Sequence, residues 1–82
     1  MTKSDYIKKI KALVIANSDL INISALEIKA GFPKNALRKS LKGTRVMDPR
    51  EALRIANVLH ELGFNFSGFC VTIQELNKLP YR

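Results

Sequence analysis

The chain of 82 residues is poor in the residue types that build metal sites, cross-links and catalytic centres. Its one cysteine, Cys70, excludes an intrachain disulfide and a cysteine-cluster zinc site, and we interpret it as a small apolar core residue. The one histidine, His60, has no cysteine partner at metal-ligand spacing, so we interpret it as a surface or helix-end residue. No nucleophile–base pair and no phosphate-cradling Gly-rich loop is present. We therefore expect no metal, no cofactor and no enzymatic activity.

Long hydrophobic runs and acidic residues are also scarce. No apolar run approaches the roughly 20 residues that span a bilayer, and the start of the chain lacks the hydrophobic region of a signal peptide. We therefore expect a cytoplasmic protein that does not associate with membranes. The 7 acidic residues stand against 14 Lys and Arg, and the resulting net charge of +7 favours a polyanionic partner, with nucleic acid preferred to an anionic membrane.

What the chain does contain is typical of one small globular domain over residues 1–82. Apolar residues make up 46% and charged residues 26%, a balance that supports one modest core and argues against disorder. No internal repeat, low-complexity stretch or Gly/Ser/Pro linker divides the sequence. We expect an all-α fold, a small bundle of about five helices.

The most informative stretch predicts two short helices joined by a tight turn. Helical patterns cover residues 23–30 and 34–42, a break follows the first of them at residues 31–33, and Gly43 ends the second. The region 34–45 holds no acid, and its cations are Lys34, Arg38, Lys39, Lys42 and Arg45. Two short helices about a Gly-containing turn, the second strongly basic, indicate a helix-turn-helix.

The charges of the second helix fall on one side of it. At roughly 100° per residue, Leu41 lies about 40° from Leu37, so these two residues form the packing face. The polar residues lie between about 60° and 200° from Leu37: Lys34, Asn35, Arg38, Lys39 and Lys42. Such side chains can neutralise phosphates and donate to base edges. An ordinary solvated face remains the alternative.

The first two helices have recognisable caps and inward residues. A helix over residues 6–16 can be capped by Ser4 or Asp5. It buries a stripe of Ile7, Ile10, Leu13 and Val14. The next helix begins at a capping-box spacing of Ser24 and Glu27, with Asn22 as a competing cap. Its inward residues are Leu26 and Ala30, followed by Phe32 as a plug into the core, while Pro33 suits the first turn of the helix after it.

The last two helices follow equally local signals. Asp48 and Glu51 form a capping box with Pro49 between them, and open a helix that ends at Gly63. We expect this helix to turn inward Ala52, Ile55, Ala56, Leu59 and Leu62. A second capping box opens a short final helix that stops before Pro80. The box residues are Thr72 and Glu75, and the expected inward residues are Ile73 and Leu76.

The segment between these helices is rich in phenylalanine. A brief extended hairpin over 64–71 would turn at Ser67 and Gly68. Its aromatic residues are Phe64, Phe66 and Phe69. They either complete the core or form a contact with a second chain, and the core is preferred.

Three segments together resemble the phage-repressor and Cro-type (lambda-repressor-like) helix-turn-helix family. They are LEIKAG at residues 26–31, LRKSLKG at residues 37–43, and the helix that follows at 48–63. The resemblance covers about half of the chain, from Ile23 to Gly63. It implies a five-helix bundle whose third helix, about residues 34–42, enters the major groove of DNA. It also implies operator binding as a symmetric homodimer, as in many members.

The resemblance also assigns roles by position. The base-reading positions fall on Lys34, Asn35 and Lys39. The positions that face DNA phosphates fall on Arg38, Lys42, Thr44 and Arg45. The chain departs from the family at three places, where Ile23 replaces a frequent glutamine, Glu27 a small residue and Ser40 an apolar residue. We expect Glu27 to alter the packing of the two helices, and Leu41 to take over the packing of Ser40.

These features predict a sequence-specific double-stranded-DNA-binding protein, a transcriptional regulator of prokaryotic or phage type. An alternative from another class is a protein-interaction module, such as the antitoxin partner of a toxin–antitoxin pair, with the Phe-rich segment as its partner surface. Single-strand RNA binding is disfavoured because the basic helix has no aromatic stacking platform.

Overall fold

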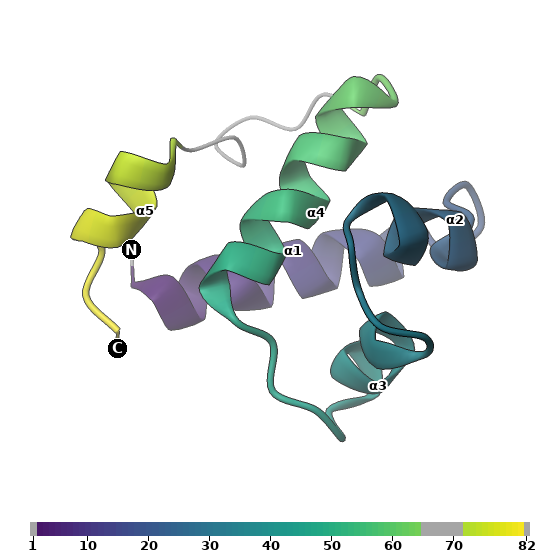
Figure 1. Ribbon diagram of the computed structural model, residues 1–82, viewed down its shortest axis with the longest axis horizontal. Coiled ribbons are helices and arrows are strands. Elements are labelled where there is room, and N and C mark those ends of the chain that lie inside the picture. Colours follow the sequence, from purple (N-terminus) through teal and green to yellow (C-terminus); the bar gives the residue numbers. More distant parts are fainter. Residues whose placement is uncertain (1, 65–71, 82) are drawn as a thin grey trace.

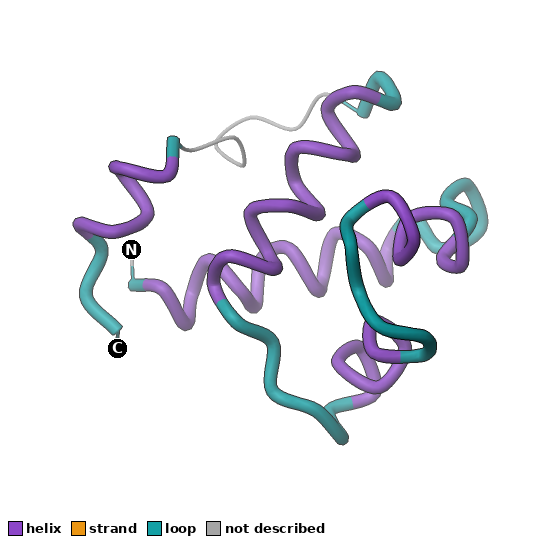
Figure 2. The backbone as a smooth tube through the Cα atoms, viewed as in Figure 1, coloured by secondary structure: helices purple, strands orange, loops and turns teal. Residues whose placement is uncertain are grey.

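The fold is built from helices alone over the described part of the chain, residues 2–64 and 72–81 of the computed structural model (Figures 1 and 2). The helices are α1 (Lys3–Ala16), α2 (Ile23–Lys29), α3 (Ala36–Lys42), α4 (Pro49–Glu61) and α5 (Ile73–Lys78). The expected all-α bundle of about five helices is thereby confirmed. The hairpin expected over 64–71, and with it Cys70, falls outside the described residues beyond Phe64.

α1 begins earlier than its hydrophobic stripe predicted. Thr2, and neither Ser4 nor Asp5, is the N-cap: its hydroxyl accepts from the Asp5 amide at 3.0 Å, and the Asp5 carboxylate accepts from the Thr2 amide at 3.2 Å. This reciprocal capping box satisfies two amides that the first turn leaves unpaired. The same hydrogen bonds hold the pKa of Asp5 below its usual value. The prediction failed because Thr2, Ser4 and Asp5 are all good caps.

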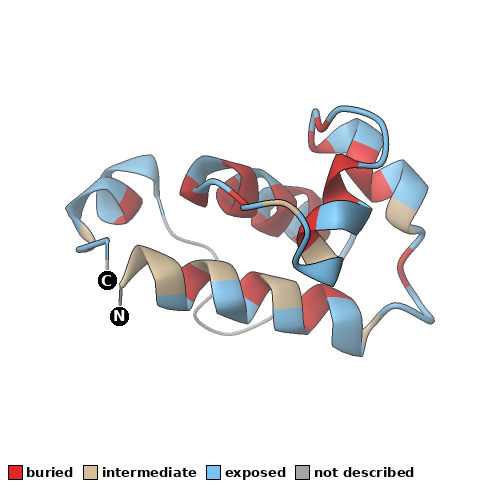
Figure 3. Cartoon of the chain, turned by 90° about the horizontal axis from the view of Figure 1, so that it is seen from below, coloured by how far each residue is buried: buried red, intermediate tan, exposed pale blue. Residues whose placement is uncertain are grey.

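The core lies where α4 packs against α1, with α2 and α5 also in contact with α4. α1 contributes Tyr6, Ile10 and Val14 to it, all fully buried, and turns its polar residues outward (Figure 3). Ile55 of α4 is fully buried as well. Ile7, expected in the core, is only half-buried at its edge.

α4 is confirmed as a capped helix, with one correction at its end. The Asp48 carboxylate accepts from the Arg50 amide at 2.8 Å, and the capping box with Glu51 is formed. Four of the five expected inward residues are buried; Leu62 is 49% exposed because the helix ends at Glu61 and Gly63 turns the chain at a φ of +92°. His60 is exposed in the last turn of α4.

The end of the chain returns to the start of α1 (Figure 1). α5 is capped by Thr72, whose hydroxyl accepts from the Glu75 amide at 3.1 Å, and Leu76 is its buried anchor. Ile73, expected to point inward with Leu76, is 45% exposed, because this helix of 6 residues meets the core with a single residue. After α5 the Pro80 carbonyl accepts from the Lys3 amide at 2.7 Å.

Candidate nucleic-acid interface

The turn between α2 and α3 is longer than the sequence indicated. Asn22 caps α2, accepting from the Ala25 amide at 3.1 Å, so the capping box expected at Ser24 and Glu27 is wrong. α3 begins at Ala36, two residues later than predicted, and Asn35 precedes it in the left-handed region at a φ of +65°. Pro33 therefore lies in the turn and outside the helix. Lys34 and Asn35 belong to the turn as well.

Hydrogen bonds to Glu27 hold this turn in its conformation. Its side chain is buried, and its two carboxylate oxygens accept from the Asn35 amide at 2.6 Å and from the Leu37 amide at 3.2 Å. Its backbone carbonyl also accepts from the Phe32 amide at 2.9 Å. The carboxylate thus serves as a cap for α3, a task that the Asn35 side chain does not perform.

One side of α3 is buried and the other is cationic. Ala36, Leu37 and Ser40 face the interior, and Leu41 is half-buried. Leu41 packs against the edge of the core, as expected, and the small Ser40 side chain is itself fully buried, with its hydroxyl accepting from Arg45 Nη1 at 3.0 Å. A hydroxyl is tolerated there because that guanidinium reaches it.

The expected DNA-binding residues of α3 and its turn are brought together on one exposed surface. We call this surface the α3 cationic face, and it consists of Lys34, Asn35, Arg38, Lys39 and Lys42, all exposed. Within the described residues, none of its cations forms a salt bridge with an acid. Arg38 donates from Nη2 to the Ser24 hydroxyl at 2.7 Å, which links the face to the first turn of α2.

The two loop residues predicted to touch phosphates differ from one another. Thr44 is exposed, and both its amide and its hydroxyl donate to the Lys39 carbonyl, at 3.0 and 3.1 Å. Arg45 is half-buried, and its Nη1 and Nη2 donate to the two carboxylate oxygens of Glu51 at 3.1 and 2.7 Å. The hydrogen bonds from Arg45, with a further one from the Asp48 amide, outweigh burial and lower the pKa of Glu51. The hydrogen bonds to Glu51 and its negative charge also raise the pKa of Arg45.

Phe32 is buried, as the sequence predicted, and two arginine side chains lie against its ring. The guanidinium carbons of Arg45 and Arg54 lie 5.7 and 6.0 Å from the ring centroid, at cation–π distances. The sequence reasoning missed Arg54 and its exposed neighbour Arg50, one helical turn away on α4. Their spacing of four residues on a helix was the available signal. Both line a shallow hollow together with Arg45, so cations continue from the loop after α3 onto α4.

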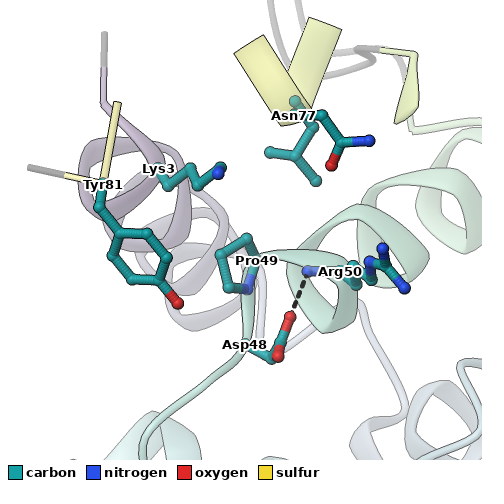
Figure 4. Close-up of a pocket in the computed structure, with 7 residues that line it drawn as sticks. Lys3, Asp48, Pro49, Arg50, Asn77 and Tyr81 are labelled. Carbon is teal, nitrogen blue, oxygen red and sulfur yellow. Dashed lines mark hydrogen bonds between the residues drawn. The ribbon is translucent and has the colours of Figure 1, made fainter. Parts of the chain in front are cut away.

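A hollow beside the start of α4 offers no comparable chemistry. It measures about 230 Å³ and is lined by the start of α1, the start of α4 and the end of the chain, with Lys3, Arg50 and Tyr81 at its rim (Figure 4). Its carboxylate, Asp48, is engaged as the cap of α4, as the dashed contact to the Arg50 amide shows. Over residues 2–64 and 72–81, no three acidic, histidine or cysteine side chains gather to hold a metal. None of the helices described is long and apolar enough to cross a bilayer.

Comparisons of the chain with protein-family models, with curated proteins and with solved structures found no match. The candidate site therefore rests on its own chemistry. It offers several cations that have no acidic partner among the described residues, and one amide, on a short helix and its turn that pack on the core by an apolar face. Such an arrangement can bind a polyanion whose surface a helix can enter.

Proposed function

We propose that the protein binds double-stranded DNA in a sequence-specific way, with α3 in the major groove. The observation that carries this proposal is the α3 cationic face. Its lysines and Arg38 are exposed and have no acidic partner in residues 2–64 and 72–81, whereas the opposite side of α3 is buried. A solvated helix face in a protein of mixed charge usually has acids among its cations, and this one has none.

The size of the elements supports groove binding. A helix such as α3 is about 10–12 Å across with its side chains, and the major groove, about 12 Å wide, admits it. In this arrangement Lys34, Asn35 and Lys39 lie at the base edges. Lysine donates to guanine, and the asparagine amide pairs with adenine.

Phosphate contacts then come from the flanks of the same surface. Arg38, Lys42 and Thr44 border the base-reading residues, and we add Arg50 and Arg54 of α4 to them. Arg45 is largely committed to Glu51 and Ser40, which leaves its Nε–H and one Nη2 hydrogen for a phosphate. Phosphate contacts fix the register of the protein on the duplex, and base contacts supply the sequence preference.

The proposal places the protein in the cytoplasm as a transcriptional regulator of the phage-repressor or Cro type, without enzymatic activity. Its DNA site is an inverted repeat bound by two copies of the chain, as the resemblance implies. The protein-interaction alternative depends on the Phe-rich segment, which beyond Phe64 lies outside the described residues, so nothing in the structure adds to it.

Selection of bound duplexes from a random DNA library tests the proposal. The wild-type protein should enrich one sequence, and Lys39→Ala should lose that enrichment. The matched control is Lys78→Ala on α5, at the opposite end of the molecule from α3, which should select the same sequence as the wild type (Figure 1). Wild-type protein that enriches no sequence and binds all DNA weakly would contradict the proposal.

A further inference from the structure

Glu27 has an unusual place in the candidate interface, because this one residue accepts hydrogen bonds from three amides of the segment that carries Lys34 and Asn35, two of the three predicted base-reading residues. Its backbone carbonyl binds the Phe32 amide at 2.9 Å, and its carboxylate binds the amides of Asn35 and Leu37 at 2.6 and 3.2 Å. Lys34 lies between the first two of these anchored positions. The path of the chain from residue 32 to residue 37 is thus held from α2 at both ends.

Within this segment the Ala36 amide also donates to the Pro33 carbonyl at 3.0 Å, but no side chain of the turn caps α3. α3 is only 7 residues long, Asn35 makes no side-chain cap, and its φ of +65° lies in a region that L-residues seldom occupy. Asparagine enters this region more readily than most non-glycine residues, and the hydrogen bonds to Glu27 add to that preference. Hydrogen bonds to a buried carboxylate are stronger than neutral ones, so they can hold the turn in this conformation.

We propose that Glu27 is a positioning residue, which sets the direction in which the side chains of Lys34 and Asn35 leave the turn and thereby sets the sequence preference. This inference rests on the proposed DNA-binding function. Glu27 itself does not touch DNA in this scheme, because its carboxylate is turned toward the backbone of the turn. Base-edge hydrogen bonds require placement within a few tenths of an ångström, so a loosened turn loses discrimination before it loses affinity for phosphates.

The variants Glu27→Gln and Glu27→Asp distinguish the positioning role of Glu27 from an effect of net charge on DNA binding. Glutamine keeps one accepting oxygen and presents an NH₂ group to the second amide, which then lacks an acceptor. Aspartate keeps the charge on a stem that is one CH₂ shorter. Glu61→Gln is the matched control, since Glu61 is exposed near the end of α4 and its loss changes net charge by the same amount.

Two measurements are made on each protein. The first is amide hydrogen exchange of Asn35 and Leu37 by NMR without DNA, which should accelerate in both Glu27 variants and stay unchanged in Glu61→Gln. The second is the ratio of affinities for the selected duplex and a scrambled duplex. This ratio should fall about tenfold in Glu27→Gln, the discrimination carried by one good base contact. Unfolded protein lowers both affinities equally, so a purely structural defect leaves the ratio unchanged.

The outcomes distinguish the two proposals. A wild-type protein that discriminates between duplexes, together with Glu27 variants that keep its ratio, overturns the role of Glu27 and leaves the DNA-binding function standing. A Glu61→Gln protein that loses as much discrimination as Glu27→Gln also overturns it, because net charge alone then explains the effect. A wild-type protein without any discrimination overturns the proposed function, and the role of Glu27 in sequence reading with it.

Discussion

Arg45 and Glu51 form a two-pronged ion pair, 2.7 Å at its shorter contact, that ties the loop after α3 to the first turn of α4. The same carboxylate accepts from the Asp48 amide at 2.9 Å, so Glu51 completes the cap of α4 and holds Arg45 at once. Through Arg45 the pair reaches the buried Ser40 hydroxyl on the inner side of α3. The position of the cationic helix relative to the core thus depends on a small polar network.

This network predicts a pH dependence of stability. The pKa of Glu51 is lower in the folded protein than in the unfolded chain, chiefly because of the hydrogen bonds from Arg45. The resulting stabilisation is present above the unfolded value, about pH 4.3, and is lost as the pH falls through the folded value. Glu51→Gln should lower the free energy of unfolding at pH 7 by about 1 kcal/mol, a modest figure because water screens the half-exposed Arg45.

Urea unfolding of both proteins from pH 7 to pH 3 checks this prediction. The gap in unfolding free energy between wild type and Glu51→Gln should be constant down to about pH 5 and should close toward pH 3. A gap that does not change across this range would show that the charge of Glu51 adds no stability.

Lys42→Ala should weaken binding to every duplex by a similar factor. Lys42 stands at the end of α3, where the proposal assigns it to a phosphate, so its loss removes one counterion-release contact. The slope of log K against log salt concentration should become shallower by about 0.9. Fluorescence anisotropy at several salt concentrations measures this slope. An unchanged slope, or a loss confined to one sequence, would speak against the phosphate assignment.

The backbone of Asn35 allows its side chain and its conformation to be tested separately. Asn35→Ala places a Cβ-bearing residue without a polar side chain at a φ of +65° and should cost roughly 1 kcal/mol of stability, whereas glycine adopts this φ freely. Asn35→Ala and Asn35→Gly both remove the side-chain amide and should lose sequence discrimination to the same extent. Thermal unfolding and competition binding measure the two effects. A fall in discrimination for Asn35→Ala alone would assign the effect to the backbone and not to the side chain.

Packing of α3 onto the core should dominate its stability. Leu37 is fully buried, and Leu37→Ala should lower the free energy of unfolding by about 2–5 kcal/mol through lost burial and a residual cavity. The control is Ile28→Ala on α2, where the side chain is 76% exposed and the change should stay within about 0.5 kcal/mol. Equal losses in the two variants, measured by urea unfolding, would contradict this packing of α3.

The features that the sequence predicted well depend on neighbours along the chain. The cap of α4 at Asp48, the cap of α5 at Thr72 and the buried Phe32 after Gly31 follow from residues within four positions of one another. The exposed cations of residues 34–42 also follow locally, because helical spacing separates them from Leu37. Local hydrogen bonds and the period of a helix suffice for these features.

The remaining features required the tertiary structure, because they join side chains to distant backbone. The late start of α3 depends on the Glu27 carboxylate, which reaches amides 8 and 10 residues further on. The sequence predicted Arg45 as a phosphate contact, but the packing of α4 brings Glu51 against it. The polar Ser40 is buried at a position where an apolar residue is frequent, and Arg45 donates a hydrogen bond to its hydroxyl. The sequence by itself determined which segments are helical and which helix carries the charge. Only the packing of α2, α3 and α4 decided which polar groups hold the fold and which remain exposed for a partner.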